Sequence, residues 1–394
     1  MPSDTASTSA VWCYNHPSQT LRGRPMKIRF VSLALMVLAL LSPVAASAAA
    51  QPVKLVQFKP MFRVLRYHGL KPLVATGGLP QWNGSYKYKG QTYHFTMVGK
   101  NPASNNATTT IPVVIIPIKM VFGATNGAMT FNPVTKKVHG VTVIQRIINS
   151  PLFDGSLDFT QGGTDVGQTQ YIDAYQRGSF WSAVSTHPNY HTLLGTPTVL
   201  AEQTIHVKAS QGQVISAFGV AAGLMNVNDY DKAIQALIAT FPQITPKVLP
   251  IFVTYDIYLS DTSDISQCCI GGYHSFNGVN TYMTATFVDV PGAFAQDVSA
   301  LSHEIGEWLT DPFTNNTDVP ALCGTTGNDN QILEVGDPLE GLTNYGAYPY
   351  SLNGFTYNLQ DLVFISYFGA PLAKSVNSWW TFQGTTAGVC VNGG

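Results

Sequence analysis

The sequence predicts an α+β fold, with a mixed sheet, a strand-rich first half and an amphipathic helix in the C-terminal half. Two observations predict it. Short segments rich in β-branched and aromatic residues alternate in polarity, as half-buried strands do. Other segments repeat apolar residues at helical spacing. With 394 residues, 45% of them hydrophobic, the chain can bury the core of one large domain or of two ordinary ones.

The expected elements follow in chain order. A hairpin is expected over residues 85–96, where alternating segments flank Lys89-Gly90-Gln91. Further strands are expected at residues 111–122, 200–209, 248–259, 281–290 and 356–365. Helices are expected at residues 141–149, 168–181, 228–241 and 297–311.

The first 50 residues have the pattern of an export signal. A short basic start at residues 26–30 precedes an apolar run at 31–41, which is too short to cross a bilayer, and then small residues at 44–50. We expect an upstream extension at residues 1–25, a Sec-type signal peptide at 26–50, and a secreted or periplasmic mature protein. An uncleaved membrane anchor is the alternative. No later segment could span a membrane, so no stable membrane insertion is expected.

Four cysteines follow the signal peptide, and an even number in an exported chain suggests two disulfides. A bridge between the neighbours Cys268 and Cys269 would be strained. Each is therefore expected to join Cys323 or Cys390, with buried free thiols as the alternative.

Charge is unevenly distributed along the chain. Charged residues make up only 11% of the sequence, and the net charge is −1. Residues 248–373 contain fourteen acids and no Lys or Arg, whereas residues 51–247 contain sixteen Lys and Arg and seven acids. A block of like charge needs a counter-charge, which the basic part of the chain or bound cations could supply. We expect no nucleic-acid partner.

The helix expected at residues 297–311 has two different faces. Asp297 is its expected N-cap, and Asp311 before Pro312 is its expected end. Apolar side chains form one stripe along it. The opposite face carries the ionisable side chains His303, Glu304, Glu307 and Asp311.

This acidic face indicates a metal site rather than a solvated surface. Glu304, Glu307 and Asp311 are neighbours on the helix, and the last turns disfavour anions, so a divalent cation would reverse both effects. His303 and Glu307 are one turn apart and can reach one ion. Glu304 follows the histidine, where H-E-x-x-H metalloproteases place the general base that takes a proton from metal-activated water.

The remaining ligand must come from another segment. Glu334 and Asp337 flank Gly336, which permits a tight turn, and are the best source. His274 is an alternative. Asp311 lies two turns from His303, too far along the helix axis to share its ion. The pair His187 and His191 lies in a segment that prolines make loop-like.

The C-terminal half resembles a known group of proteins. The motifs that carry the likeness are Tyr273-His274 after the paired cysteines, His303-Glu304-x-x-Glu307-x-x-Thr310-Asp311-Pro312, Glu334-x-Gly336-Asp337, and Asn353-Gly354-x-x-Tyr357-x-x-Gln360 with Cys390. Over residues 250–394 the chain resembles exported bacterial zincin-like proteins with an H-E-x-x-E motif. It is more distantly similar to the phosphate-induced (Exordium-like) secreted proteins.

The resemblance implies a zincin-like α+β fold in which a mixed sheet packs on the active-site helix. It implies His303 and Glu307 as metal ligands, Glu304 as base, and the turn with Glu334 and Asp337 completing the site. We therefore expect a strand-rich part at residues 51–165 and a zincin-like metal-binding part at residues 166–394.

The functional prediction is a secreted, zinc-dependent hydrolase of the metallopeptidase type. His303, Glu307 and Asp337, or Glu334, hold the ion, and Glu304 activates water against a peptide or protein substrate. The alternative is a non-catalytic secreted protein with a structural Ca²⁺ or zinc site used in surface or cell-wall binding. A glycosidase with two carboxylates is a third reading, and the sequence leaves the oligomeric state open.

Overall fold

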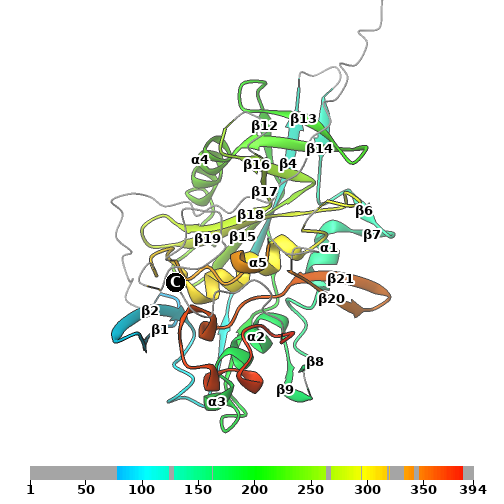
Figure 1. Ribbon diagram of the computed structural model, residues 1–394. Helices are drawn as coiled ribbons and strands as arrows, with labels where there is room; N and C mark the ends of the chain where they lie inside the picture. Colours follow the sequence, from blue (N-terminus) through cyan, green and yellow to red (C-terminus); the bar gives the residue numbers. More distant parts are fainter. Residues whose placement is uncertain are drawn as a thin grey trace, which may run out of the picture. The chain divides into compact units, whose positions relative to one another are not determined.

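The computed structural model describes residues 78–123, 128–161, 163–262, 268–293, 295–316, 319, 332–340 and 346–384 (Figure 1). The expected upstream extension and signal peptide, together with Cys323 and Cys390, lie outside these residues and stay predictions. None of the helices in the described ranges is long and apolar enough to cross a membrane.

The largest sheet in the described part of the chain has seven strands. Across the sheet these are β11 (Thr198–Val199), β4 (Val113–Phe122), β15 (Leu249–Tyr255), β19 (Thr281–Phe287) and β18 (Gly272–Phe276), with β12 (Gln203–Val207) and β5 (Met129–Phe131) also paired with β4. Strands β4, β15 and β19 run parallel, and β18 is antiparallel to β19. All residues of β15 and β19 are buried, as in central strands covered on both faces.

The other described strands form smaller sheets. A four-stranded sheet contains β13 (Gly212–Ala217), β14 (Val220–Asn226), β16 (Ile257–Ser260) and β17 (Cys268–Ile270). The two-stranded sheets are β1 (Gln81–Tyr88) with β2 (Gln91–Val98), β3 (Thr108–Ile111) with β10 (His191–Leu194), β6 (Lys137–Val138) with β7 (Val141–Thr142), β8 (Leu157–Gln161) with β9 (Thr164–Thr169), and β20 (Ala347–Leu352) with β21 (Phe355–Gln360).

The helices occupy most of the segments expected to form them. They are α1 (Val143–Ile148), α2 (Tyr171–Ser179), α3 (Trp181–Val184), α4 (Val227–Ile238), α5 (Ser299–Thr310) and α6 (Asp337–Glu340), followed by the short 3-10 turns η3 (Ile365–Phe368), η4 (Leu372–Lys374) and η5 (Val376–Ser378). The prediction of a mixed, strand-rich fold with a mixed sheet packed against the motif helix is confirmed; the sheet has seven strands. That sheet contains strands from the expected N-terminal part at residues 51–165 and from the expected metal-binding part at residues 166–394.

Two expected strands are each divided. Pro112 separates β3 from β4, and the two strands pair with different partners. The segment 248–259 breaks at Asp256, which has a φ of 49° and turns the chain from β15 in the large sheet to β16 in the four-stranded sheet. The Asp256 carboxylate accepts a hydrogen bond from the Asp289 backbone N–H at 2.7 Å. Alternation alone could not reveal this side-chain anchor at the break.

The cysteine pairing differs from the expectation. Cys268 and Cys269 form a disulfide with each other, and the peptide bond between them is cis, which places their Cα atoms 3.0 Å apart rather than at the trans spacing of about 3.8 Å. The expected link from this pair to Cys323 or Cys390 is therefore wrong.

Helix α5 packs against β18, β19 and β21 (Figure 1). Its apolar stripe is buried as expected, and the indole N–H of Trp308 donates to the Thr281 hydroxyl at 2.9 Å. The helix ends at Thr310, with Asp311 as the C-cap. Asp297 is not the N-cap: Val298 has that place, and the Asp297 carboxylate accepts from the backbone N–H groups of Val298 and Asn358. It thereby ties the helix start to β21.

Candidate metal centre

The ionisable face of α5 is buried. His303 and Glu304 are each 5% exposed, and Glu307 is 3% exposed, so this face is not a solvated surface. The segment around Gly336 and strand β18 bring further ionisable side chains against it. Because buried charges are costly without partners, the contacts of each group decide what the centre can do.

His303, Glu307 and Asp337 form the first ligand group. His303 Nε2 lies 3.0 Å from Glu307 Oε2 and 3.5 Å from Asp337 Oδ1, and the three ligand atoms all lie within 4.8 Å of one another. Ligand atoms about 2.1 Å from a tetrahedral ion are about 3.4 Å apart. The separations therefore suit one divalent ion, and the structure brings together three of the four residues predicted as ligands.

Gln360 sets the tautomer of His303. The Gln360 side-chain N–H donates to the Gly336 carbonyl at 2.7 Å, and since a carbonyl can only accept, Gln360 Oε1 must face His303. His303 Nδ1 lies 2.8 Å from that oxygen and donates to it. In neutral His303 the lone pair would then be on Nε2, facing Glu307 and Asp337, where an ion would bind; without an ion, a proton on Nε2 lets the charged ring donate to Glu307 at 3.0 Å. This is the arrangement of a metal-binding histidine held by a second residue.

Gly336 allows this close approach. A Cβ atom at Gly336 would lie 2.3 Å from His303 Nδ1, so only glycine fits between the turn and the imidazole. Its backbone N–H donates to Glu307 Oε1 at 3.0 Å. The expected tight turn thus contacts two of the predicted ligands through its backbone.

His274, Glu304 and Glu307 form a second group. His274 Nδ1 lies 3.3 Å from Glu304 Oε2 and 3.9 Å from Glu307 Oε2. Its other ring nitrogen, Nε2, lies 3.0 Å from the backbone carbonyl of Asp311 and donates to it. His274 is therefore held in place by the end of α5, and Glu307 belongs to both groups.

The histidines and burial shift the pKa values of this cluster in opposite directions. Burial would raise the pKa of Glu307, but the charge and hydrogen bond of His303 lower it to about 2. Burial raises the pKa of Glu304, against the opposing effect of His274 and His303. Burial would lower the pKa of His274, but its hydrogen bond with Glu304 and the surrounding carboxylates raise it.

Glu334 has no protein donor in the described part of the chain. Its side chain is buried, with the residue 2% exposed, and neither carboxylate oxygen accepts a hydrogen bond. It lies beside Glu307, close enough to share a proton with it. Burial, followed by the charges of Glu307, Asp311 and Asp337, raises its pKa well above the usual range. A carboxylate so placed needs either a proton or a cation.

The two ligand groups meet the expected chemistry of a divalent-metal site. Glu334 belongs to neither group, but its buried carboxylate beside Glu307 has no donor among the described residues, which fits a centre that needs a cation. Asp311 belongs to neither ligand group. Its carboxylate accepts from the backbone N–H groups of Asn315 and Asn316 and shapes the chain after α5.

No known protein family, characterised protein or solved structure matches this chain. The argument about function therefore depends on the geometry of the site itself. That geometry shows buried His, Glu and Asp groups that could bind a metal ion.

Sequence reasoning overlooked one positioning residue at this centre. Gln360 was part of the C-terminal motif, but its contact with His303 depends on how β21 packs against α5. His274 was only an alternative ligand, and the structure places it in the second ligand group with Glu304 and Glu307. The pair His187 and His191 is engaged elsewhere, with Pro102 and Asp173 respectively.

Proposed function

We propose that this chain is an exported, zincin-like, metal-dependent hydrolase that acts on peptide bonds. The observation that carries the proposal is the first ligand group: His303, with its tautomer set by Gln360, faces Glu307 and Asp337 in a buried centre. Imidazole nitrogen and carboxylate oxygen are both zinc ligands, so this set of one imidazole and two carboxylates can hold the ion. The predicted export of the chain supports the proposal.

The chain's own residues have separate roles in this mechanism. His303, Glu307 and Asp337 would hold the ion. A bound ion supplies Lewis acidity, which makes water a stronger acid and polarises the substrate carbonyl. Glu304 accepts the proton of the attacking water, and its pKa, raised by burial, suits a group that must later release that proton. His274 orients the Glu304 carboxylate through the contact at 3.3 Å.

The experiment combines metal analysis with casein hydrolysis by the purified mature protein. We expect about one zinc per chain. His303→Ala should lose the metal, and His206→Ala, which removes an exposed histidine from β12, should keep it. Glu304→Gln should keep the metal and lower hydrolysis roughly 10²- to 10⁴-fold. A wild-type protein without stoichiometric metal would refute the metal site, and unchanged hydrolysis in Glu304→Gln would remove Glu304 from the mechanism.

Burial of the centre favours a second candidate function, a non-catalytic protein whose ion stabilises the fold for surface or cell-wall binding. Only 12% of the Asp337 side chain and 7% of the His303 side chain is exposed, which leaves little room for a substrate. This candidate predicts bound metal and a strong loss of thermal stability on chelation, without hydrolysis. Calcium seldom takes a histidine ligand, so loss of the ion in His303→Ala would favour zinc over calcium.

A further inference from the structure

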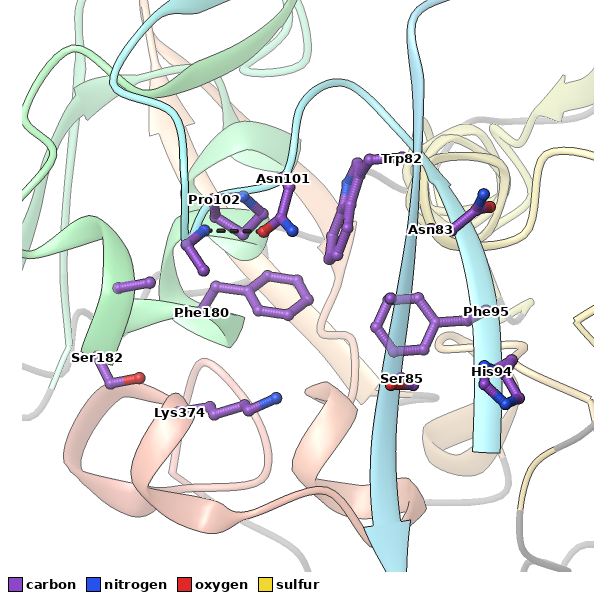
Figure 2. A pocket seen from close by; sticks show the side chains of 13 residues that line it. Trp82, Asn83, Ser85, His94, Phe95, Asn101, Pro102, Phe180, Ser182 and Lys374 are labelled. Carbon is purple, nitrogen blue, oxygen red and sulfur yellow. Dashed lines mark hydrogen bonds between the residues drawn. The ribbon is translucent and has the colours of Figure 1, made fainter. Parts of the chain in front are cut away.

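A cavity of about 520 Å³ lies between the β1–β2 hairpin, the segment 101–103, α3 and η4 (Figure 2). No residue of the metal centre lines it. Its volume is in the range of pockets that bind small organic molecules. The ligand of this cavity would therefore be recognised by side chains other than those of the metal centre.

Three aromatic rings form one wall of the cavity. The rings of Trp82 and Phe95 meet edge-on with centroids 5.4 Å apart, and those of Trp82 and Phe180 meet at 5.6 Å. Gly84 makes room for this arrangement, because a Cβ atom there would lie 2.2 Å from the Phe95 ring. Such a wall can pack against the flat face of a six-membered ring.

The indole N–H of Trp82 is an unused donor. Its nitrogen is buried and has no hydrogen-bond partner within the described residues, although an indole N–H can only donate. Figure 2 shows the indole facing the cavity beside Asn101 and Phe180. Buried donors are nearly always satisfied, so this indole lacks the acceptor it would usually have among the described residues, and its ring rather than its buried nitrogen is what the cavity offers to a ligand.

Lys374 places a positive charge at the same cavity. It is the sole Lys or Arg in the sequence from residue 248 to the end, and Figure 2 shows its ammonium group reaching toward the space between Phe180 and Phe95. No Asp or Glu lines the cavity, and no acid in the described ranges forms an ion pair with Lys374. Burial lowers its pKa, consistent with a missing counter-charge.

We propose that this cavity binds a small carboxylate carried on a six-membered ring. The carboxylate pairs with Lys374, and the ring packs against Trp82 and Phe180. An aromatic acid and an acidic sugar share this chemistry. The polar side chains at the edge, including Asn83 and Ser182, can accommodate hydroxyl groups. The proposal is independent of the metal centre.

Isothermal titration calorimetry of the full mature protein tests this proposal with four probes. Phenylacetate and glucuronate are the two acids, and phenylacetamide and glucose are their neutral counterparts. At least one acid should bind, roughly ten- to hundredfold more tightly than its neutral counterpart. Treatment with EDTA should not change this preference.

Variants localise the binding. Lys374→Met keeps the apolar stem and should weaken binding of the acid roughly ten- to hundredfold. Trp82→Phe leaves a smaller ring in the wall and should weaken binding of the acid about fivefold, because less aromatic surface packs against the ligand. Lys208→Met removes an exposed lysine elsewhere and should have no effect. Absence of binding by both acids, equal affinity for acid and neutral probe, or unchanged affinity in Lys374→Met would each overturn the proposal.

Discussion

Replacing Gln360 by methionine tests the geometry of the centre without removing a ligand. Methionine has a similar length but cannot form the hydrogen bonds at 2.8 Å to His303 Nδ1 and at 2.7 Å to the Gly336 carbonyl. His303 then loses the acceptor that holds its proton on Nδ1 and keeps Nε2 free for the ion. Loss of such a supporting hydrogen bond typically weakens metal binding about 10- to 100-fold, or about 1.4–2.8 kcal/mol.

The same substitution removes the acceptor of the buried His303 Nδ1–H, whereas the Gly336 carbonyl keeps the hydrogen bond from the Leu339 N–H at 3.3 Å. An unsatisfied buried group costs about 1–3 kcal/mol, so the metal-free protein should lose roughly that much unfolding free energy. Urea unfolding of the metal-free protein measures this loss. Competition with a chromophoric zinc chelator measures the affinity in the folded protein. Gln213→Met, at an exposed position in β13, is the matched control.

The two measurements separate the possible results. Weaker zinc binding by a protein that remains folded supports the role of Gln360 in orienting His303. If Gln360→Met is folded and binds zinc with wild-type affinity, the assigned tautomer does not matter for metal binding, and the reasoning about the first ligand group is refuted.

Three further predictions concern residues around the centre and the core. Gly336→Ala would place a Cβ atom 2.3 Å from His303 Nδ1 and should lower both the metal content and the melting temperature. Gly155→Ala has open space around it and should change neither; equal effects of the two substitutions would contradict the close approach of Gly336 to His303. Glu334→Gln should raise the melting temperature of the metal-free protein in differential scanning calorimetry, because burial beside other carboxylates raises the pKa of Glu334 and thereby destabilises the folded state at neutral pH. A lower melting temperature in the variant would contradict this reasoning. Burial raises the pKa of Asp361 to about 7, so this carboxyl group binds its proton more tightly in the folded protein than in the unfolded chain. The resulting contribution to stability is present at low pH and is lost as the pH rises from about 4 to 7, by at most about 1.4 kcal/mol per pH unit. Between these pH values the free energy of unfolding should therefore change less steeply with pH in Asp361→Asn than in the wild type. An unchanged slope of unfolding free energy against pH would exclude Asp361 as the cause.

Much of the local structure could be read from the sequence because short-range physics decides it. The H-E-x-x-E spacing places His303 and Glu307 one turn apart on any α-helix, and the apolar stripe determines which side of α5 enters the core. The absence of Lys and Arg from residues 248–373 indicated that the acidic face needs another source of positive charge. The Gly90 turn and the strands around it follow from equally local preferences.

The tertiary structure decided which distant groups complete the centre. Sequence left Glu334 and Asp337 as equal candidates, and packing of their turn against α5 puts Asp337 in the first ligand group while Glu334 remains without a donor. The contacts of Gln360 with His303 and of His274 with Glu304 join segments 57 and 30 residues apart. The Cys268–Cys269 bridge and the turn at Asp256 likewise departed from the local expectation.

The sequence by itself therefore determined the motif helix, its two faces and the need for a counter-charge. Only the tertiary structure decided the partners of each ionisable group and the lining of the Lys374 cavity. The physical reason is that helix and strand periodicity depends on neighbouring residues, whereas contacts between distant segments depend on the packing of the whole core.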